Sequence, residues 1–216
     1  MQKVFKIFTL FLLGLVGLAG LMQAQMAFAN KTTVLVMGDS LSAGYGMALE
    51  QAWPALLQQR MQSVAAQDHW LVINASVSGE TTQGGVRRLP ALLDKYQPQW
   101  VLLELGANDG LRGYPIAKMT ANLSAMVEQS QAAGAQVAVL GIQLPPNYGE
   151  RYTGPFFAQY AQLAQRNNTA LVPFILQNIA IHADLMQADG LHPTQAAQEL
   201  IVDNVWQHLA GLWQLN

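Results

Sequence analysis

The chain has 216 residues, of which 51% are hydrophobic and only 11% are charged, and it contains no cysteine. This length suits one domain or at most two small ones, and a formal net charge of −2 gives no indication of a nucleic-acid partner. Without cysteine, the chain has no disulfide framework, no thiolate metal site and no cysteine nucleophile.

The first residues have the pattern of an export signal. Lys3 and Lys6 precede an uncharged, mostly apolar run over residues 7–22, and Ala27-Phe28-Ala29 has the small residues of a cleavage site. We predict that residues 1–29 are a secretory signal peptide, because this run is shorter than the roughly 20 residues that span a bilayer. The alternative is an uncleaved N-terminal anchor.

Cleavage would leave residues 30–216 as one domain with a net charge of −4, because the removed segment holds two lysines and no acidic residue. A domain of this size can bury about 70% of its unfolded surface and needs no disulfides for stability. We expect it to be periplasmic or secreted, without stable membrane insertion. We also expect a monomer, because no heptad pattern indicates association.

Short apolar runs alternate with longer helical patterns along this domain. The runs lack polar alternation, which is typical of strands buried on both faces, and they cover residues 33–37, 71–75, 100–105, 136–142 and 170–174. Helical patterns cover residues 53–62, 86–96, 116–133, 156–167 and 193–212. Repeated strand–helix units predict an α/β fold, with a parallel sheet covered by helices on both faces.

Two details of this pattern can be tested. The last predicted helix begins at Pro193, whose missing N–H costs nothing at a first helical position. Residues 143–154, which contain prolines and glycines, predict a long loop after the fourth strand. Apolar residues of the last helix recur at spacings of three and four and predict one buried face: Ala197, Leu200, Ile201, Val205, Leu209 and Leu212.

Polar residues stand where the predicted strands end. Ser40 follows the first strand, Gly79 the second and Asn108 the third, while Asp189 and His192 precede the last helix. Ligands of parallel sheets bind beyond the carboxyl ends of the strands. We therefore expect these five residues to meet at one edge of the sheet.

The residue types predict nucleophilic catalysis. A serine hydroxyl becomes a good nucleophile when a base takes its proton, and His192 is a suitable base for Ser40. Asp189, three residues before His192, can fix the imidazole tautomer and stabilise the imidazolium. The backbone N–H groups of Ser40 and Gly79 and the side-chain amide of Asn108 are candidate donors to an oxyanion.

The blocks that hold these residues resemble the SGNH, or GDSL, hydrolases, whose Ser, Gly, Asn and His fall on Ser40, Gly79, Asn108 and His192. The blocks are GDSLSAGYGM, NASVSGETTQGG, LGANDGLRG and DGLHP. The resemblance extends over residues 33–209 and is closest to the secreted bacterial esterases with thioesterase, lysophospholipase and arylesterase activities. One departure is Ala107, where relatives often have glycine.

The resemblance implies a flavodoxin-like three-layer α/β/α sandwich with five parallel strands. It implies hydrolysis of small-molecule acyl esters and thioesters through an acyl-enzyme, without a metal or another cofactor. It also implies an acyl groove beside the loops after the third and fourth strands, although ordinary loop packing is the alternative for these positions. The candidate substrate-binding residues are Leu111, Tyr114, Leu144, Pro145 and Tyr148.

Other interpretations remain open from the sequence. Asp39 and Asp109 could belong to a metal phosphoesterase, although such sites need several histidine ligands and only His192 is well placed. A non-catalytic flavodoxin-like binding domain and a carbohydrate acetylesterase of the same family are further alternatives. We predict that Asp39 and Asp109 organise their loops, while Glu104, in an apolar strand, has no explanation from the sequence.

Overall fold

The computed structural model describes residues 31–65 and 69–215 of the chain. The predicted signal peptide, residues 1–29, lies outside the described residues, so its cleavage stays a prediction. Within the described ranges, no helix combines the length and apolar character needed to cross a membrane.

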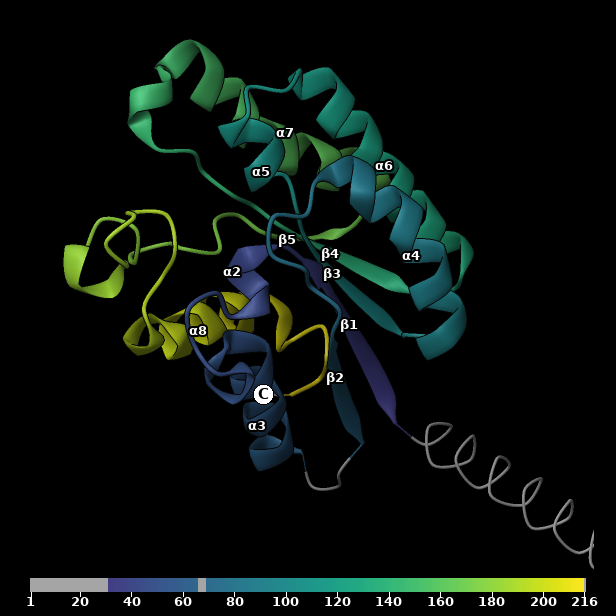
Figure 1. Ribbon diagram of the computed structural model, residues 1–216. Coiled ribbons are helices and arrows are strands. Elements are labelled where there is room, and N and C mark those ends of the chain that lie inside the picture. The colour runs from purple at the N-terminus through teal and green to yellow at the C-terminus, as the bar shows by residue number, and fades with distance from the viewer. Residues whose placement is uncertain (1–30, 66–68, 216) are drawn as a thin grey trace, which may run out of the picture. The chain divides into compact units, whose positions relative to one another are not determined.

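Five strands form one sheet in which every neighbouring pair is parallel, as predicted. Their order across the sheet is β2-β1-β3-β4-β5, so β1 lies between β2 and β3, and the carboxyl ends of all five meet at one edge (Figure 1). The strands are β1 Thr32–Gly38, β2 Trp70–Asn74, β3 Trp100–Glu104, β4 Gln136–Leu140 and β5 Ala170–Val172.

Helices cover both faces of this sheet. One face packs against α3 and α8 and the other against α4, α6 and α7, which confirms the predicted three-layer α/β/α architecture (Figure 1). The short helices α2 and α5 directly follow β1 and β3. The helices are α2 Ser40–Ala43, α3 Trp53–Val64, α4 Thr82–Tyr96, α5 Ala107–Leu111, α6 Ile116–Ala132, α7 Glu150–Asn167 and α8 Gln198–Leu209.

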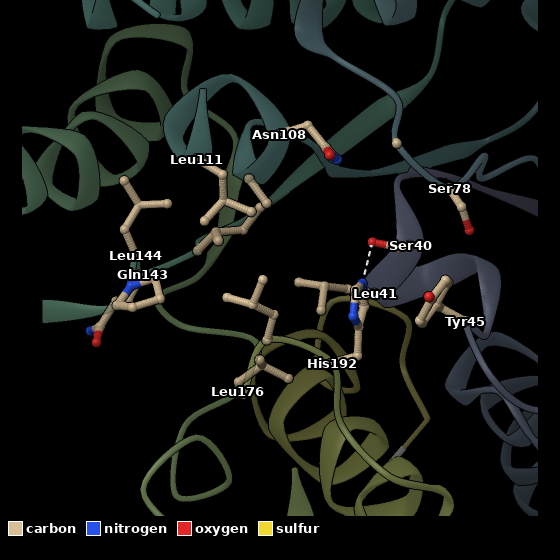
Figure 2. Close-up of a pocket in the computed structure, with 15 residues that line it drawn as sticks. Ser40, Leu41, Tyr45, Ser78, Asn108, Leu111, Gln143, Leu144, Leu176 and His192 are labelled. Carbon is tan, nitrogen blue, oxygen red and sulfur yellow. Dashed lines mark hydrogen bonds between the residues drawn. The ribbon is translucent and has the colours of Figure 1, made fainter. Parts of the chain in front are cut away.

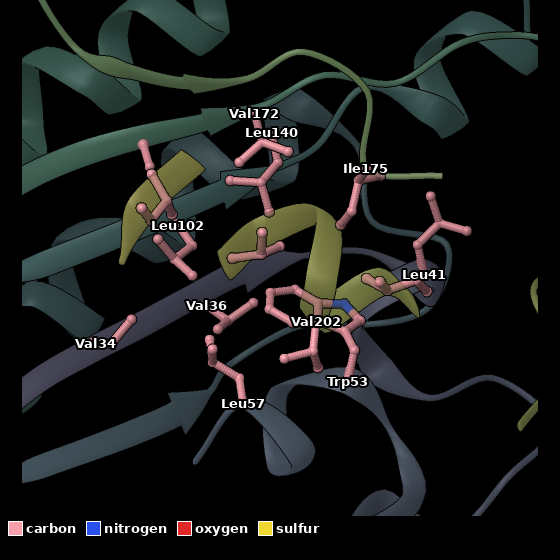
Figure 3. Packing of buried hydrophobic residues seen from close by; sticks show 14 of the residues in the cluster. Val34, Val36, Leu41, Trp53, Leu57, Leu102, Leu140, Val172, Ile175 and Val202 are labelled. Atoms are coloured by element: carbon pink, nitrogen blue, oxygen red, sulfur yellow. The ribbon is translucent and has the colours of Figure 1, made fainter. Parts of the chain in front are cut away.

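The side chains of β1 show why its sequence is apolar throughout. Val34 and Val36 belong to the cluster beneath α3 and α8, part of which is drawn in Figure 3. Leu35 and Met37 belong to the cluster on the opposite face. All four are fully buried. Because helices cover both faces, a strand in this sheet needs apolar residues at every position and not only at alternate ones.

Part of the outer edge of β2 is bonded to a side chain. Gln58, on α3, accepts a hydrogen bond from the backbone N–H of Val72 at 2.6 Å through Oε1 and donates one to the carbonyl of Trp70 at 3.1 Å through Nε2. The side-chain amide therefore bonds to the strand much as a neighbouring strand would.

Three predicted helix starts are wrong. α4 begins at Thr82, four residues before the predicted start at residue 86. α7 begins at Glu150, inside the segment predicted as a long loop, and the 3-10 turn Pro146–Tyr148 precedes it. Pro155 lies near the start of α7, where a proline removes only one intrahelical hydrogen bond. α8 begins at Gln198 and not at Pro193, because Pro193 pairs with Met186 in a short antiparallel bridge that ends the preceding loop.

The predicted buried face of the last helix is only partly correct. Ala197, Ile201, Val205 and Leu209 are fully buried, whereas Leu200 and Leu212 are 39% and 54% exposed. Leu212 lies beyond the end of α8, so the helical spacing no longer determines where its side chain points.

β4 and β5 each end two residues before the predicted boundary. Gly141, just beyond β4, lies so close to the segment after β5 that an added Cβ would lie 2.0 Å from the carbonyl oxygen of Pro173. The position therefore requires glycine for lack of space. Gly154, in α7, has no atom within 4 Å of an added Cβ.

We predict that Gly141→Ala destabilises the protein by about 1–3 kcal/mol, because a backbone atom must move to admit the methyl group. The matched control Gly154→Ala is expected to be neutral or slightly stabilising, since alanine is favoured over glycine within a helix. Urea unfolding of both variants measures the difference, and equal stabilities of the two would contradict this account.

Candidate active site

A pocket of about 300 Å³ opens at the carboxyl edge of the sheet and contains Ser40, Gly79, Asn108 and His192 among its lining residues. The sequence prediction that these residues meet at one edge is therefore confirmed (Figure 2). The remaining wall is mostly apolar and includes Leu41, Leu111, Ile142, Leu144, Pro145 and Leu176.

Ser40 is the first residue of α2, and the sequence around it explains the tight turn. Asp39 caps the helix, since its Oδ1 accepts from the backbone N–H of Leu41 at 3.1 Å. Gly38 has no room for a side chain, because an added Cβ would lie 2.6 Å from Oε2 of Glu104. Gly44 ends the helix in the left-handed conformation, with φ of 76°. These residues turn the hydroxyl of Ser40 into the pocket.

His192 connects Ser40 with Asp189. Its Nε2 lies 2.8 Å from Oγ of Ser40, and its Nδ1 lies 2.7 Å from Oδ2 of Asp189. Oδ1 of Asp189 accepts from the backbone N–H groups of Leu191 and His192 at 2.9 and 3.0 Å. Partial burial raises the pKa of Asp189, but the hydrogen bonds from His192 and Leu191 outweigh it and lower the pKa to about 2. Asp189 is therefore ionised at neutral pH.

Asn108 lies on α5, and its amide is held by the nucleophile turn. Nδ2 of Asn108 donates to Oδ2 of Asp39 at 3.1 Å, which leaves a second N–H for another acceptor. Ala107 also lines the pocket. Gly79 has φ of 79°, a conformation that favours glycine, and its place in the loop after β2 brings its backbone to the pocket wall.

Asp109 links the Asn108 turn to the start of α4. Its two carboxylate oxygens accept from the backbone N–H and the hydroxyl of Thr82 at 2.8 and 2.7 Å. Asn122, on α6, donates to the same hydroxyl at 3.0 Å. The buried carboxylate of Asp109 thus joins the loops that carry Asn108 and Gly79, which agrees with its predicted role in loop organisation.

Glu104, unexplained by the sequence, lies beneath the nucleophile turn. Its Oε2 accepts from the hydroxyl of Ser42 at 2.7 Å and from the backbone N–H of Asp39 at 3.3 Å. Nε1 of Trp53 donates to the same hydroxyl at 3.2 Å. Complete burial, followed by the negative charge of Asp39, raises the pKa of Glu104 well above its ordinary range. Glu104 therefore supports the turn from below, and its burial favours the protonated carboxyl group.

Asp39 is also fully buried. Burial raises the pKa of its carboxyl group from 3.8 to about 6, although hydrogen bonds from Leu41 and Asn108 oppose this rise. The sequence did contain a signal that Asp39 is buried, because it directly follows Gly38 at the end of an apolar strand. No comparable signal marks the partner of Glu104, because Ser42 comes from a different strand–helix unit.

Only three of the five candidate substrate-binding residues line the pocket. Leu111, Leu144 and Pro145 line the pocket, whereas Tyr114 and Tyr148 are not among the lining residues. The hydroxyl of Tyr148 donates to the carbonyl of Leu111 at 3.1 Å. Tyr114, which is 45% exposed, offers its carbonyl to the hydroxyl of Tyr152 at 2.9 Å.

Sequence reasoning missed several residues of this pocket wall. Tyr45 and Leu41 come from the nucleophile turn and its continuation, and Ile142 and Leu176 follow β4 and β5. The position after a strand was the available signal for Ile142 and Leu176. Among residues 31–65 and 69–215, no group of three or more His, Asp or Glu side chains is arranged to hold a metal ion.

Comparison with known proteins places this geometry in a family. The model of the GDSL-like lipase/acylhydrolase family matches residues 36–200. The chain is 48% identical over 180 residues to "Esterase TesA" of Pseudomonas aeruginosa, covering 83% of this chain and 89% of that protein. It is 46% identical over 180 residues to "Thioesterase 1/protease 1/lysophospholipase L1" of Escherichia coli K12, covering 83% and 84%.

A solved structure of similar fold is the psychrotrophic esterase EstA from Pseudoalteromonas sp., described as inhibited by monoethylphosphonate. It superposes with a TM-score of 0.79 at 47% sequence identity, covering 86% of this chain and all of that one. The family model and these relatives extend over most of the chain, and the residues that the family model matches include the whole pocket. The chain therefore belongs to the GDSL-like lipase/acylhydrolase family and is a hydrolase of ester bonds.

Proposed function

We propose that this protein hydrolyses carboxylic esters and acyl thioesters through an acyl-enzyme formed on Ser40. The observation that carries the proposal is the pair of short contacts from His192, 2.8 Å to Ser40 and 2.7 Å to Asp189, at an apolar pocket. Aryl esters, lysophospholipids and acyl-CoA are the proposed substrates. The apolar wall favours acyl chains over the carbohydrate acetyl esters of the alternative.

In the first step, Nε2 of His192 takes the proton of Ser40 while Oγ attacks the acyl carbonyl carbon. The contact with Asp189 keeps the proton of the neutral imidazole on Nδ1, so Nε2 has a free lone pair. Because Asp189 is ionised, it also stabilises the imidazolium. The histidine then returns the proton to the leaving alcohol or thiol, and water releases the acyl group by the same route.

The negative charge on the carbonyl oxygen needs preorganised donors. We propose the free N–H of the Asn108 amide, together with the backbone N–H groups of Ser40 and Gly79. Asp39 holds the Asn108 amide through its other N–H, so the donor needs no reorientation during the reaction. The reported phosphonate inhibition of the Pseudoalteromonas relative supports this mechanism, because a phosphonate is tetrahedral like the intermediate.

The pocket has two different sides around Ser40. Leu111, Leu144 and Leu176 lie on one side, whereas Tyr45 and Ser78 lie on the other (Figure 2). We propose that the acyl chain lies along the leucine side and that the leaving group points past Tyr45 towards solvent. Leucine side chains bury methylene groups of the acyl chain, and each buried methylene contributes about 0.8 kcal/mol.

The proposed site of action is the periplasm or the exterior of the cell. Support comes from residues 1–29, whose two lysines, apolar run and small-residue motif have the order of an export signal. We propose that the processed enzyme acts as a monomer.

We predict that Ser40→Ala lowers kcat/KM by a factor of about 10³ or more for every substrate, because removal of a serine nucleophile abolishes the covalent route. The substrates to compare are p-nitrophenyl esters with acyl chains of different length, palmitoyl-CoA and lysophosphatidylcholine. Ser63, an exposed residue of α3 that does not line the pocket, offers the control Ser63→Ala. Wild-type rates for Ser40→Ala would rule out the acyl-enzyme.

Leu144→Asn tests the acyl side of the pocket. We expect a larger loss of kcat/KM for long-chain than for acetyl p-nitrophenyl esters, because only a long chain reaches the altered wall. The control is Leu212→Asn at an exposed leucine, and circular dichroism confirms that both variants are folded. Equal losses for acetyl and long-chain esters would contradict the proposed position of the acyl chain.

The buried carboxyl group of Asp39 predicts a pH-dependent stability. The folded protein holds the proton of Asp39 more tightly than the unfolded chain, so the stabilising contribution is complete below about pH 4 and is lost as the pH rises through about 6. Asp39→Asn removes this loss. From pH 4 to 7, the stability of the variant relative to wild type should rise by up to about 3 kcal/mol.

Urea unfolding of wild type and Asp39→Asn at several pH values measures this difference. Asp94→Asn, at an exposed position on α4, serves as the control and is expected to follow the wild-type curve. If the difference in stability between Asp39→Asn and wild type is constant over this pH range, folding does not raise the pKa of Asp39.

A further inference from the structure

The two hydrogen bonds of His192 leave one motion of the imidazole unrestrained. Its two partners, Ser40 and Asp189, bond to the two ring nitrogens, so the ring can still tilt about the line that joins them. A tilt turns the lone pair of Nε2 away from Oγ and weakens the hydrogen bond, because such bonds weaken steeply with angle. A contact with the face of the ring is needed to prevent it.

Tyr45 makes this contact. Its ring stacks on the imidazole of His192 with a centroid separation of 4.2 Å and an interplanar angle of 29°. Figure 2 shows Tyr45 beside His192, on the side away from the leucines. The backbone of Tyr45 is bonded to the nucleophile itself, since its N–H donates to the carbonyl of Ser40 at 3.3 Å. One residue thus contacts both the imidazole of His192 and the backbone of Ser40.

Gln187 joins Tyr45 to the loop that carries His192. Its Nε2 donates to the carbonyl of Tyr45 at 2.9 Å and to the carbonyl of Pro193 at 3.0 Å. Its backbone N–H donates to the carbonyl of His192 at 2.7 Å. Gly46 leaves space for this amide, because an added Cβ there would lie 2.9 Å from Oε1 of Gln187.

These contacts hold the surface loop between Met186 and Pro193, which carries Asp189 and His192. The side chain of Asp189 is 37% exposed, and the loop is otherwise closed by the bridge between Met186 and Pro193 and by the bond from Thr194 to Leu185. The segment of Ser40 and the segment of His192 are far apart in sequence. The amide of Gln187 therefore provides direct hydrogen bonds between the two.

We propose that Tyr45 and Gln187 form a clasp that holds the imidazole of His192 in line with Ser40 and favours its cationic form during the reaction. This inference rests on the proposed role of His192 as the base. Both members are positioning residues. An aromatic face attracts a cation, and at an exposed site the attraction changes an equilibrium about two- to fivefold, to which the loss of alignment adds.

The hydroxyl of Tyr45 is not part of the clasp, because it makes no hydrogen bond within the described residues. Tyr45→Phe keeps the stacking ring, whereas Tyr45→Leu removes it. Gln187→Met keeps the length of the side chain but removes the bridging amide. These three variants separate the ring, the hydroxyl and the bridge.

The test combines steady-state kinetics on p-nitrophenyl acetate with proton NMR of the Nδ1–H of His192. We expect Tyr45→Leu and Gln187→Met to lower kcat about three- to tenfold while KM changes less than twofold, and to broaden the NMR line through faster exchange with water. Tyr45→Phe should keep both kcat and the line. The control is Tyr96→Leu, at the last residue of α4 and outside the pocket lining. It should keep the wild-type kcat and the wild-type NMR line.

A wild-type kcat in Tyr45→Leu would overturn the clasp, whatever the NMR line shows. A rise in KM at constant kcat would also overturn it, because Tyr45 would then bind substrate without positioning the base. Failure of the proposed function has a different signature, since Ser40→Ala would keep wild-type rates. The NMR line, which is observed without substrate, reports on the clasp independently of ester hydrolysis.

Discussion

A single buried carboxyl group connects the two turns on which the active site is built. Asp39 caps α2, which presents Ser40, and accepts a hydrogen bond from the amide of Asn108 on α5. These turns follow β1 and β3, which are neighbours in the sheet. The parallel register of the strands brings the turns within reach of each other, and Asp39 then sets the distance between the nucleophile and the proposed oxyanion donor.

This arrangement has a cost in charge burial. Asp39 and Glu104 lie close together, and burial raises the pKa of both. Burying two charged carboxylates is unfavourable, so this site favours the protonated form of Glu104, whose Oε2 accepts from Ser42. Two carboxyl groups with raised pKa therefore lie beneath Ser40, where their hydrogen bonds hold the turn. Perturbed pKa values of this kind are common at functional sites.

The sequence was sufficient to predict the sheet and the residues that meet at its edge. Each strand is an uninterrupted apolar run, and Ser40, Gly79 and Asn108 each follow one, so topology alone brings them together. The start of α8 was not predictable, because the bridge between Met186 and Pro193 depends on tertiary pairing. The contacts of Glu104, Tyr45 and Gln187 could not be predicted for the same reason: they join distant segments and leave no periodic pattern.

The hydrogen bonds of Gln58 to β2 have a consequence for how this protein behaves towards other copies of itself. An edge strand with free N–H and carbonyl groups can accept an additional strand from another molecule, which is a common route to aggregation. In this chain the groups of Val72 and Trp70 are already occupied. An incoming strand would first have to displace a side chain of the same molecule, so this part of the β2 edge is protected.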